Sequence, residues 1–200
     1  MREAIISKSL NIIKKDHPNF SDEKMEILEY GLTGFYMFIS KTIIIFLVAY
    51  FLGILKELII FMLIYNMIRL VSFGMHASSS TACLIASSLT FLSVTFICKI
   101  ITFPLWFKIV FGVLTILYIY KYSPADTEKR PIISPKRRLT YKVLSTIIAV
   151  VMVACSLLVN NIFVSNSMIF ALIIQSVMIS PVTYKLAGQQ YDNYKYYKKD

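Results

Sequence analysis

The sequence predicts an all-α protein, a polytopic bundle of membrane helices forming one domain over residues 1–200. Of the 200 residues, 57% are apolar, and the mean hydropathy is +0.67. The apolar residues form continuous runs such as IIIFLVAYFLGIL and STIIAVVMVACSLLV, and a helix needs roughly 20 of them to cross a bilayer. These runs lack the period-two alternation of transmembrane strands. The lipid bilayer is therefore an expected partner.

The N-terminal segment, residues 1–32, is expected to form interfacial helices. Its first part is charged throughout and lacks the apolar core of a cleavable signal peptide. Apolar residues share one helical face there, so the helix can lie on an anionic membrane surface; a surface helix packed on the bundle fits equally well. His17 and Pro18 end this helix, and a second short one is expected to begin at Ser21.

Six transmembrane or membrane-embedded helices are expected, each built on one apolar run. Their ranges are 34–54, 57–74, 79–100, 104–121, 139–159 and 162–183. The second and fourth are short for a full crossing, so tilted, re-entrant or partly interfacial positions remain open for them.

The distribution of charge predicts the orientation of the chain. The sequence carries 21 Lys and Arg against 11 Asp and Glu, and the basic residues gather in the N-terminal segment, the 122–138 loop and the 184–200 tail. Cytoplasmic segments are enriched in Lys and Arg. Both termini and the basic loop are therefore expected in the cytoplasm of a multi-pass cell-membrane protein, and nucleic acid is not expected as a partner.

Reactive side chains gather in one apolar region, where Arg69, His76 and Cys83 follow each other at seven-residue steps. On one unbroken helix, consecutive members would lie about 10.5 Å apart, whereas a base must come within roughly 3 Å of a thiol. Gly74 permits a turn, and the hydroxyl residues 78–81 can cap a new helix. Cys83 would then lie near a helix N-terminus that stabilises its thiolate, with His76 folded back toward it.

Other interpretations of these residues remain. The spacing of His76 and Cys83 alone fits packing better than chemistry, and Arg69 can extend its charge to the interface. Ionisable residues in a membrane span are costly and usually functional, which favours a site. The other cysteines, Cys98 and Cys155, form no CxxC pair, so neither a metal nor another cofactor is expected.

Two motifs resemble those of the accessory gene regulator protein B (AgrB) family. The first is Arg69-x4-Gly74-x-His76-Ala77-x5-Cys83, and the second is Tyr122-x-Pro124-Ala125-Asp126-Thr127 followed by Pro131. Their order and spacing, together with the chain's length and hydropathy, carry the resemblance. The first 30 residues and the tail YDNYKYYKKD add nothing to it.

The resemblance implies a membrane cysteine peptidase of quorum sensing that acts at the cytoplasmic side. Cys83 would attack a carbonyl of an AgrD-like precursor peptide, with His76 as general base. A side chain of the peptide would resolve the thioester, giving a thiolactone or lactone, an intermediate of the autoinducing signal. The family also suggests a homodimer.

Three further residues have expected roles in this site. Arg69 would bind a substrate carboxylate or stabilise oxyanion charge, and Gly74 would permit the turn beside it. Asp126 would orient His76 as a third member, although the sequence alone does not bring the two together. Two rival functions remain open: a carrier or exporter of a small peptide without covalent catalysis, and a non-catalytic membrane scaffold whose basic loop binds a partner.

Overall fold

The computed structural model describes residues 2–75, 80–128 and 131–196, and these are helical for most of their length. The elements, in chain order, are α1 (Arg2–Asp16), α2 (Asp22–Phe51), α3 (Leu55–Ser72), α4 (Ser80–Ile100), α5 (Leu105–Tyr122), α6 (Pro135–Leu158), α7 (Ile162–Met178), α8 (Pro181–Leu186) and a 3-10 turn, η1 (Asn193–Lys195). Within the described residues there is no strand, and one isolated parallel bridge joins Phe73 to Ala125. The prediction of an all-α fold is confirmed.

The chain divides into two compact units, Met1–Val48 and Ala49–Asp200. The first contains α1 and most of α2. As expected, α1 ends just before His17, and Ser21 caps the next helix by accepting the Lys24 N–H at 3.4 Å. The expected short second helix is not separate, however. Because no proline interrupts residues 22–51, that segment and the crossing expected at 34–54 form one continuous helix, α2.

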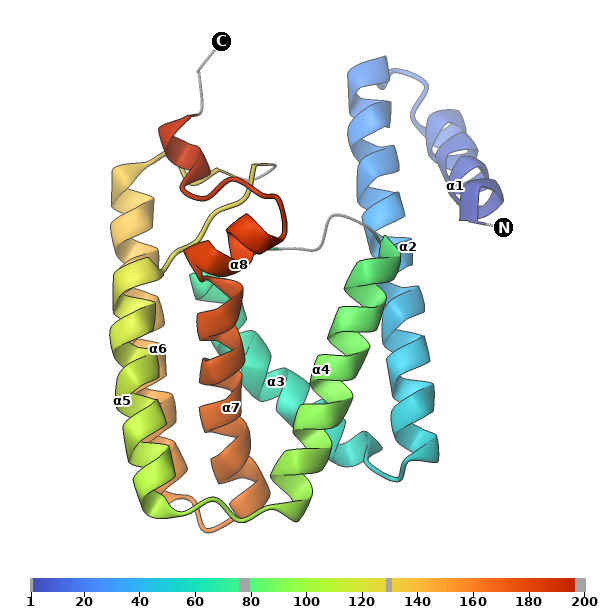
Figure 1. The fold of residues 1–200 in the computed structure, drawn as a ribbon. Helices are drawn as coiled ribbons and strands as arrows, with labels where there is room; N and C mark the ends of the chain where they lie inside the picture. The colour runs from blue at the N-terminus through green and yellow to red at the C-terminus, as the bar shows by residue number, and fades with distance from the viewer. Residues whose placement is uncertain (1, 76–79, 129–130, 197–200) are drawn as a thin grey trace. The chain divides into compact units, whose positions relative to one another are not determined.

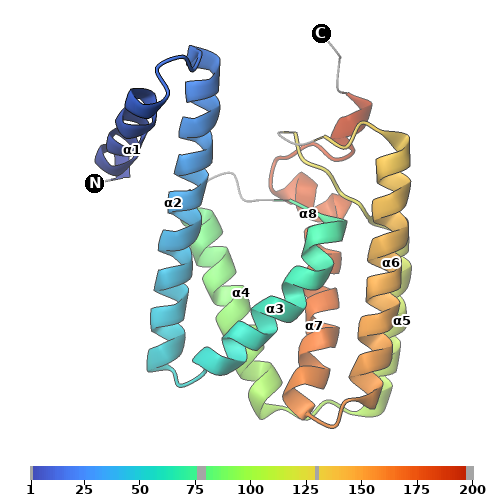
Figure 2. The same ribbon diagram turned by 180° about the vertical axis from the view of Figure 1, so that it is seen from behind.

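The second unit is built around α7, which packs against α3, α4, α5 and α6 (Figures 1 and 2). Its core lies between α3, α5, α6 and α7 and includes the fully buried Phe61, Ile68 and Leu172. Because α7 has neighbours on several sides, polar residues of this helix are buried too. One of them, Asn166, donates its amide to the Ile101 carbonyl at 2.7 Å. Helix α7 is therefore the central helix of this unit, and α3, α4, α5 and α6 pack around it.

In the described part of the chain, four helices are long and apolar enough to cross a membrane: α2, α4, α5 and α6. The apolar α7 is shorter, with 17 residues, and α3 carries Lys56, Glu57 and Arg69 within its 18 residues. Each expected crossing coincides with a helix of the structure, so the chain is a helical membrane protein. The number of crossings and their orientation stay predictions.

The last expected crossing, 162–183, is longer than the helix found there. Helix α7 ends at Met178, and the separate helix α8 begins at Pro181. Proline has no N–H for the helical ladder, so it favours the first turn of a new helix. Ser180 caps that turn by accepting the Val182 N–H at 3.2 Å.

Candidate active site

The predicted site residues lie on three separate segments of the second unit. Arg69 is in the last turn of α3 and Gly74 follows that helix, whereas Cys83 is in the first turn of α4 and Asp126 is in the loop after α5. His76 lies outside the described residues, so its distance from Cys83 stays a prediction.

A sharp turn follows α3 at Phe73 and Gly74. Phe73 has a φ of 58° and Gly74 a φ of 110°, both in the region that L side chains rarely adopt. A Cβ on Gly74 would lie 2.5 Å from Nη1 of Arg69 and 2.8 Å from the Met178 carbonyl oxygen. Glycine is therefore required here both by the backbone angle and by the lack of space.

The guanidinium of Arg69 holds this turn closed. Nη1 donates to the Phe73 carbonyl at 2.5 Å, and Nη2 donates to the carbonyls of Gly74 at 3.2 Å and Met75 at 2.8 Å. A cation is favourable at a helix C-terminus, where carbonyl groups lack helical partners. Two of the guanidinium nitrogens are thus committed to the backbone that precedes His76. Recognition of a substrate carboxylate by Arg69 stays a prediction.

The turn is bonded to the loop after α5. Gly74 N–H donates to the Ala125 carbonyl at 2.8 Å, and Ala125 N–H donates to the Ser72 carbonyl at 3.1 Å. These two bonds form the parallel bridge between Phe73 and Ala125. They join the motif that contains Arg69 and Gly74 directly to the motif that contains Asp126.

The same turn is also bonded to the end of α7. Met75 N–H donates to the Met178 carbonyl at 3.1 Å, and Nε2 of the buried Gln175 donates to the Phe73 carbonyl at 2.8 Å. Arg69 and two distant segments, the loop after α5 and the end of α7, therefore fix the backbone up to Met75, where this described part of the chain ends.

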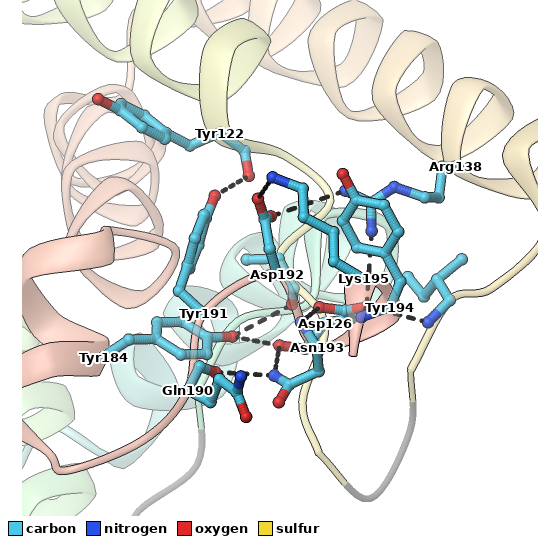
Figure 3. Close-up of polar contacts among 12 residues, drawn as sticks. Tyr122, Asp126, Arg138, Tyr184, Gln190, Tyr191, Asp192, Asn193, Tyr194 and Lys195 are labelled. Atoms are coloured by element: carbon cyan, nitrogen blue, oxygen red, sulfur yellow. Dashed lines mark hydrogen bonds and ion pairs between the residues drawn. The ribbon is translucent and has the colours of Figure 1, made fainter. Parts of the chain in front are cut away.

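The Asp126 carboxylate is engaged by the loop and the C-terminal tail (Figure 3). Its side chain is 1% exposed. Oδ2 accepts from the backbone N–H of Ile132 at 3.1 Å and of Tyr194 at 3.0 Å, and Oδ1 accepts from the Asn193 N–H at 3.0 Å. Nη1 of Arg138 lies 3.5 Å from Oδ2. The carboxylate thus already has four donors. A role for Asp126 in orienting His76 stays a prediction, and in that role the carboxylate would accept from His76 as well as from these four groups.

Tyrosines of the tail complete this network. The hydroxyl of Tyr184 donates to the Asp126 carbonyl at 2.9 Å, and that of Tyr191 donates to the Tyr122 carbonyl at 3.1 Å (Figure 3). Burial raises the pKa of both phenols above the usual value of 10.0. We call Asp126, Tyr184, Tyr191, Asn193 and Tyr194 the tail clasp. Its tail residues were not predicted, because their partners are remote in the sequence.

Cys83 is the fourth residue of α4, which begins at Ser80. This confirms that a new helix starts within the hydroxyl run, so Arg69 and Cys83 do not share one unbroken helix. The thiol of Cys83 is half-buried, like that of Cys155, whereas Cys98 is buried. Cys83 therefore lies in the first helical turn, near the positive end of the helix dipole. Among the described residues, no cluster of His, Cys, Asp and Glu that could hold a metal ion is found.

A comparison with protein-family models matches residues 6–179 to accessory gene regulator B. The chain belongs to this family. AgrB proteins take part in the processing of quorum-sensing peptides. The matched range contains both motifs around Cys83 and Asp126 but ends before the tail residues of the clasp, which therefore lie beyond the part that the family model describes.

Several curated relatives agree with this assignment. A putative AgrB-like protein of Clostridium acetobutylicum is 28% identical over 84% of this chain and 80% of its own. One from Listeria monocytogenes serovar 1/2a is 28% identical over 94% and 92%. Protein FsrB of Enterococcus faecalis is 27% identical over 88% and 72%. No solved structure matches the chain.

Proposed function

We propose that this protein is a membrane-embedded cysteine endopeptidase that cleaves an AgrD-like precursor peptide and promotes its cyclisation. The observation that carries the proposal is the place of Cys83, a half-buried thiol in the first turn of α4. The side chain there is partly accessible and lies near the positive end of the helix dipole. Family membership supports the peptide as substrate.

The proposed reaction has two steps. In the first, the Cys83 thiol gives its proton to His76, and the thiolate forms a C–S bond to a peptide carbonyl while the C–N bond breaks. His76 returns the proton to the departing amine. In the second, a thiol or hydroxyl of the peptide loses its proton to His76 and attacks the thioester. Its bond to the carbonyl forms as the bond to Cys83 breaks, and Cys83 regains a proton.

A thioester retains the activated acyl group, so its transfer to a peptide thiol is nearly isoenergetic, whereas attack by water would waste it. A site that excludes water therefore favours cyclisation over hydrolysis. We place this site at the cytoplasmic side of the membrane, with both termini cytoplasmic and the protein as a homodimer. The basic residues of the 122–138 loop support that orientation.

The closed turn at Arg69 and Gly74 supports a positioning role for this segment. Its hydrogen bonds hold the backbone up to Met75, one residue before His76. A base must be held at a defined distance from its nucleophile, because small displacements cost large factors in rate. On this proposal Arg69 acts through the backbone, and loss of its guanidinium slows the first step.

Trapping the acyl-enzyme tests the proposal. A precursor peptide whose cyclising side chain is replaced with Ala keeps the first step and loses the second, so a thioester should accumulate as a mass shift on Cys83 that hydroxylamine discharges. Cys83→Ala and His76→Ala should prevent the shift. Cys155→Ala is the matched control, since this thiol is equally half-buried but belongs to α6. Near wild-type processing by Cys83→Ala would overturn the peptidase proposal and favour the carrier.

A further inference from the structure

Two adjoining hollows lie on the α5–α6 pair. The first, of about 460 Å³, is bounded by the C-terminal end of α5, the first turns of α6 and the tail, and its lining includes Lys121, Arg138 and Tyr194. The second, of about 320 Å³, lies along the two helices. Leu139 and Lys142 line both, so the two hollows adjoin.

The first hollow carries two lysines, Lys121 and Lys142. Nζ of Lys121 lies 5.0 Å from the ring centre of Tyr122, and Nζ of Lys142 lies 4.6 Å from that of Tyr120. Among the described residues, neither ammonium has a carboxylate at ion-pair distance. Both ammonium groups are therefore available to attract an anion.

The other charges of this hollow are already paired. The Arg138 guanidinium lies between Asp126 and Asp192, and its central carbon is 3.4 Å from the ring centre of Tyr194. Asp192 also contacts Nζ of Lys195 at 2.6 Å. The arginine thus belongs to the structure of the tail, and the uncompensated positive charge of the hollow comes from the two lysines.

The second hollow is apolar. Leu139, Val143 and Ile147 follow each other at four-residue steps on α6, and they are 64%, 50% and 53% exposed. Residues at this spacing share one helical face, and the stripe extends for roughly 12 Å along the helix at 1.5 Å per residue. The stripe starts beside Lys142 and follows α6, which is long and apolar enough to cross the membrane.

We infer that the two hollows form one binding site for an anionic phospholipid. Lys121 and Lys142 would bind its phosphate, and an acyl chain would lie along Leu139, Val143 and Ile147. Basic pockets between helices at the membrane interface suit acidic lipid headgroups, and the apolar stripe supplies what the attached chain needs. A free phosphate ion would leave that stripe unused. This site is separate from Cys83 and does not depend on the proposed peptidase activity.

Native mass spectrometry of the full-length protein in detergent tests the inference with dioleoylphosphatidylglycerol and dioleoylphosphatidylcholine as probes. The wild type should retain the phosphatidylglycerol preferentially, and Lys121→Gln/Lys142→Gln should bind it roughly tenfold or more weakly. The matched control is Lys136→Gln/Arg137→Gln, which removes the same charge from exposed residues of the first turn of α6 outside both hollows. The control should bind as the wild type does.

Four results would overturn the inference. They are equal retention of the two lipids by the wild type, unchanged phosphatidylglycerol binding in the lysine variant, an equal loss in the control, and displacement of the lipid by excess inorganic phosphate, which would mark a free-anion site. The lipid comparison and the phosphate competition need only the wild-type protein, so they decide the matter even if the lysine variant does not fold.

Discussion

Replacement of Asp126 with Ala is expected to release the C-terminal tail from the loop after α5. The carboxylate is the common acceptor for backbone N–H groups of Ile132, Asn193 and Tyr194, and alanine offers no acceptor in its place. Two of those donors belong to the tail. Because the tail can move into water once its acceptor is gone, we expect local opening rather than global unfolding.

The size of the effect follows from the two tail bonds. Hydrogen bonds to a charged group contribute about 1.5–3 kcal/mol each, so opening of the tail becomes easier by roughly 3 kcal/mol or more. At 1.4 kcal/mol per factor of ten, the open population rises about a hundredfold. Asp126→Asn retains one acceptor oxygen and should give an intermediate increase.

Hydrogen–deuterium exchange of the tail measures this opening directly. The amides of Asn193 and Tyr194 should exchange about a hundredfold faster in Asp126→Ala. Glu128→Ala is the matched control, because this exposed acid of the same loop has the same charge, and it should leave the exchange rates unchanged. The opposite result would be an Asp126→Ala protein whose Asn193 and Tyr194 amides exchange at the wild-type rate but which no longer processes peptide. That result would refute the anchoring role and place the carboxylate at the reaction centre.

Three further predictions concern the turn, the tail and the topology. Gly74→Ala should lower the melting temperature and cost about 2 kcal/mol or more, because φ is 110° and the new Cβ meets the Met178 carbonyl oxygen at 2.8 Å; an unchanged melting temperature would contradict this. Burial raises the pKa of Tyr184 and Tyr191, so their contribution to stability is present below pH 10 and lost as the pH rises further. Chemical denaturation should show a decline above pH 10 that Tyr184→Phe reduces, and an equal decline in that variant would count against it. In intact cells, an impermeant thiol reagent should not label Arg130→Cys, and labelling from outside would reverse the proposed orientation.

The helices were largely predictable because the length of an apolar run sets the length of a membrane helix. Two boundaries were not. The sequence around residue 32 becomes more apolar and contains no proline, so the expected interfacial helix and first crossing form one helix, α2. At the other end, Pro181 and its capping Ser180 separate α8 from α7, and the expected crossing extended past this signal.

Local signals also predicted part of the candidate site. Gly74 and the hydroxyl run correctly indicated a break between α3 and α4, which places Cys83 near a helix N-terminus. The bonds of Arg69 to its own turn and of Asp126 to the tail were not foreseen. The acceptors of Arg69 depend on the left-handed geometry of Phe73, and the donors to Asp126 come from residues beyond α8. Neither arrangement has a periodic or local signature in the sequence.

The pairing of the turn after α3 with the loop after α5 has a consequence for protein engineering. Gly74 donates to the Ala125 carbonyl across it, Ala125 donates to the Ser72 carbonyl, and the Met178 carbonyl at the end of α7 accepts from Met75 of the same turn. In a hybrid that takes residues 69–83 alone from the Listeria relative, the turn after α3 would lose the native segments with which its backbone forms hydrogen bonds. Exchange of 69–83, 122–126 and 175–194 together keeps the backbone bonds among these three segments, so they are best exchanged as one discontinuous block.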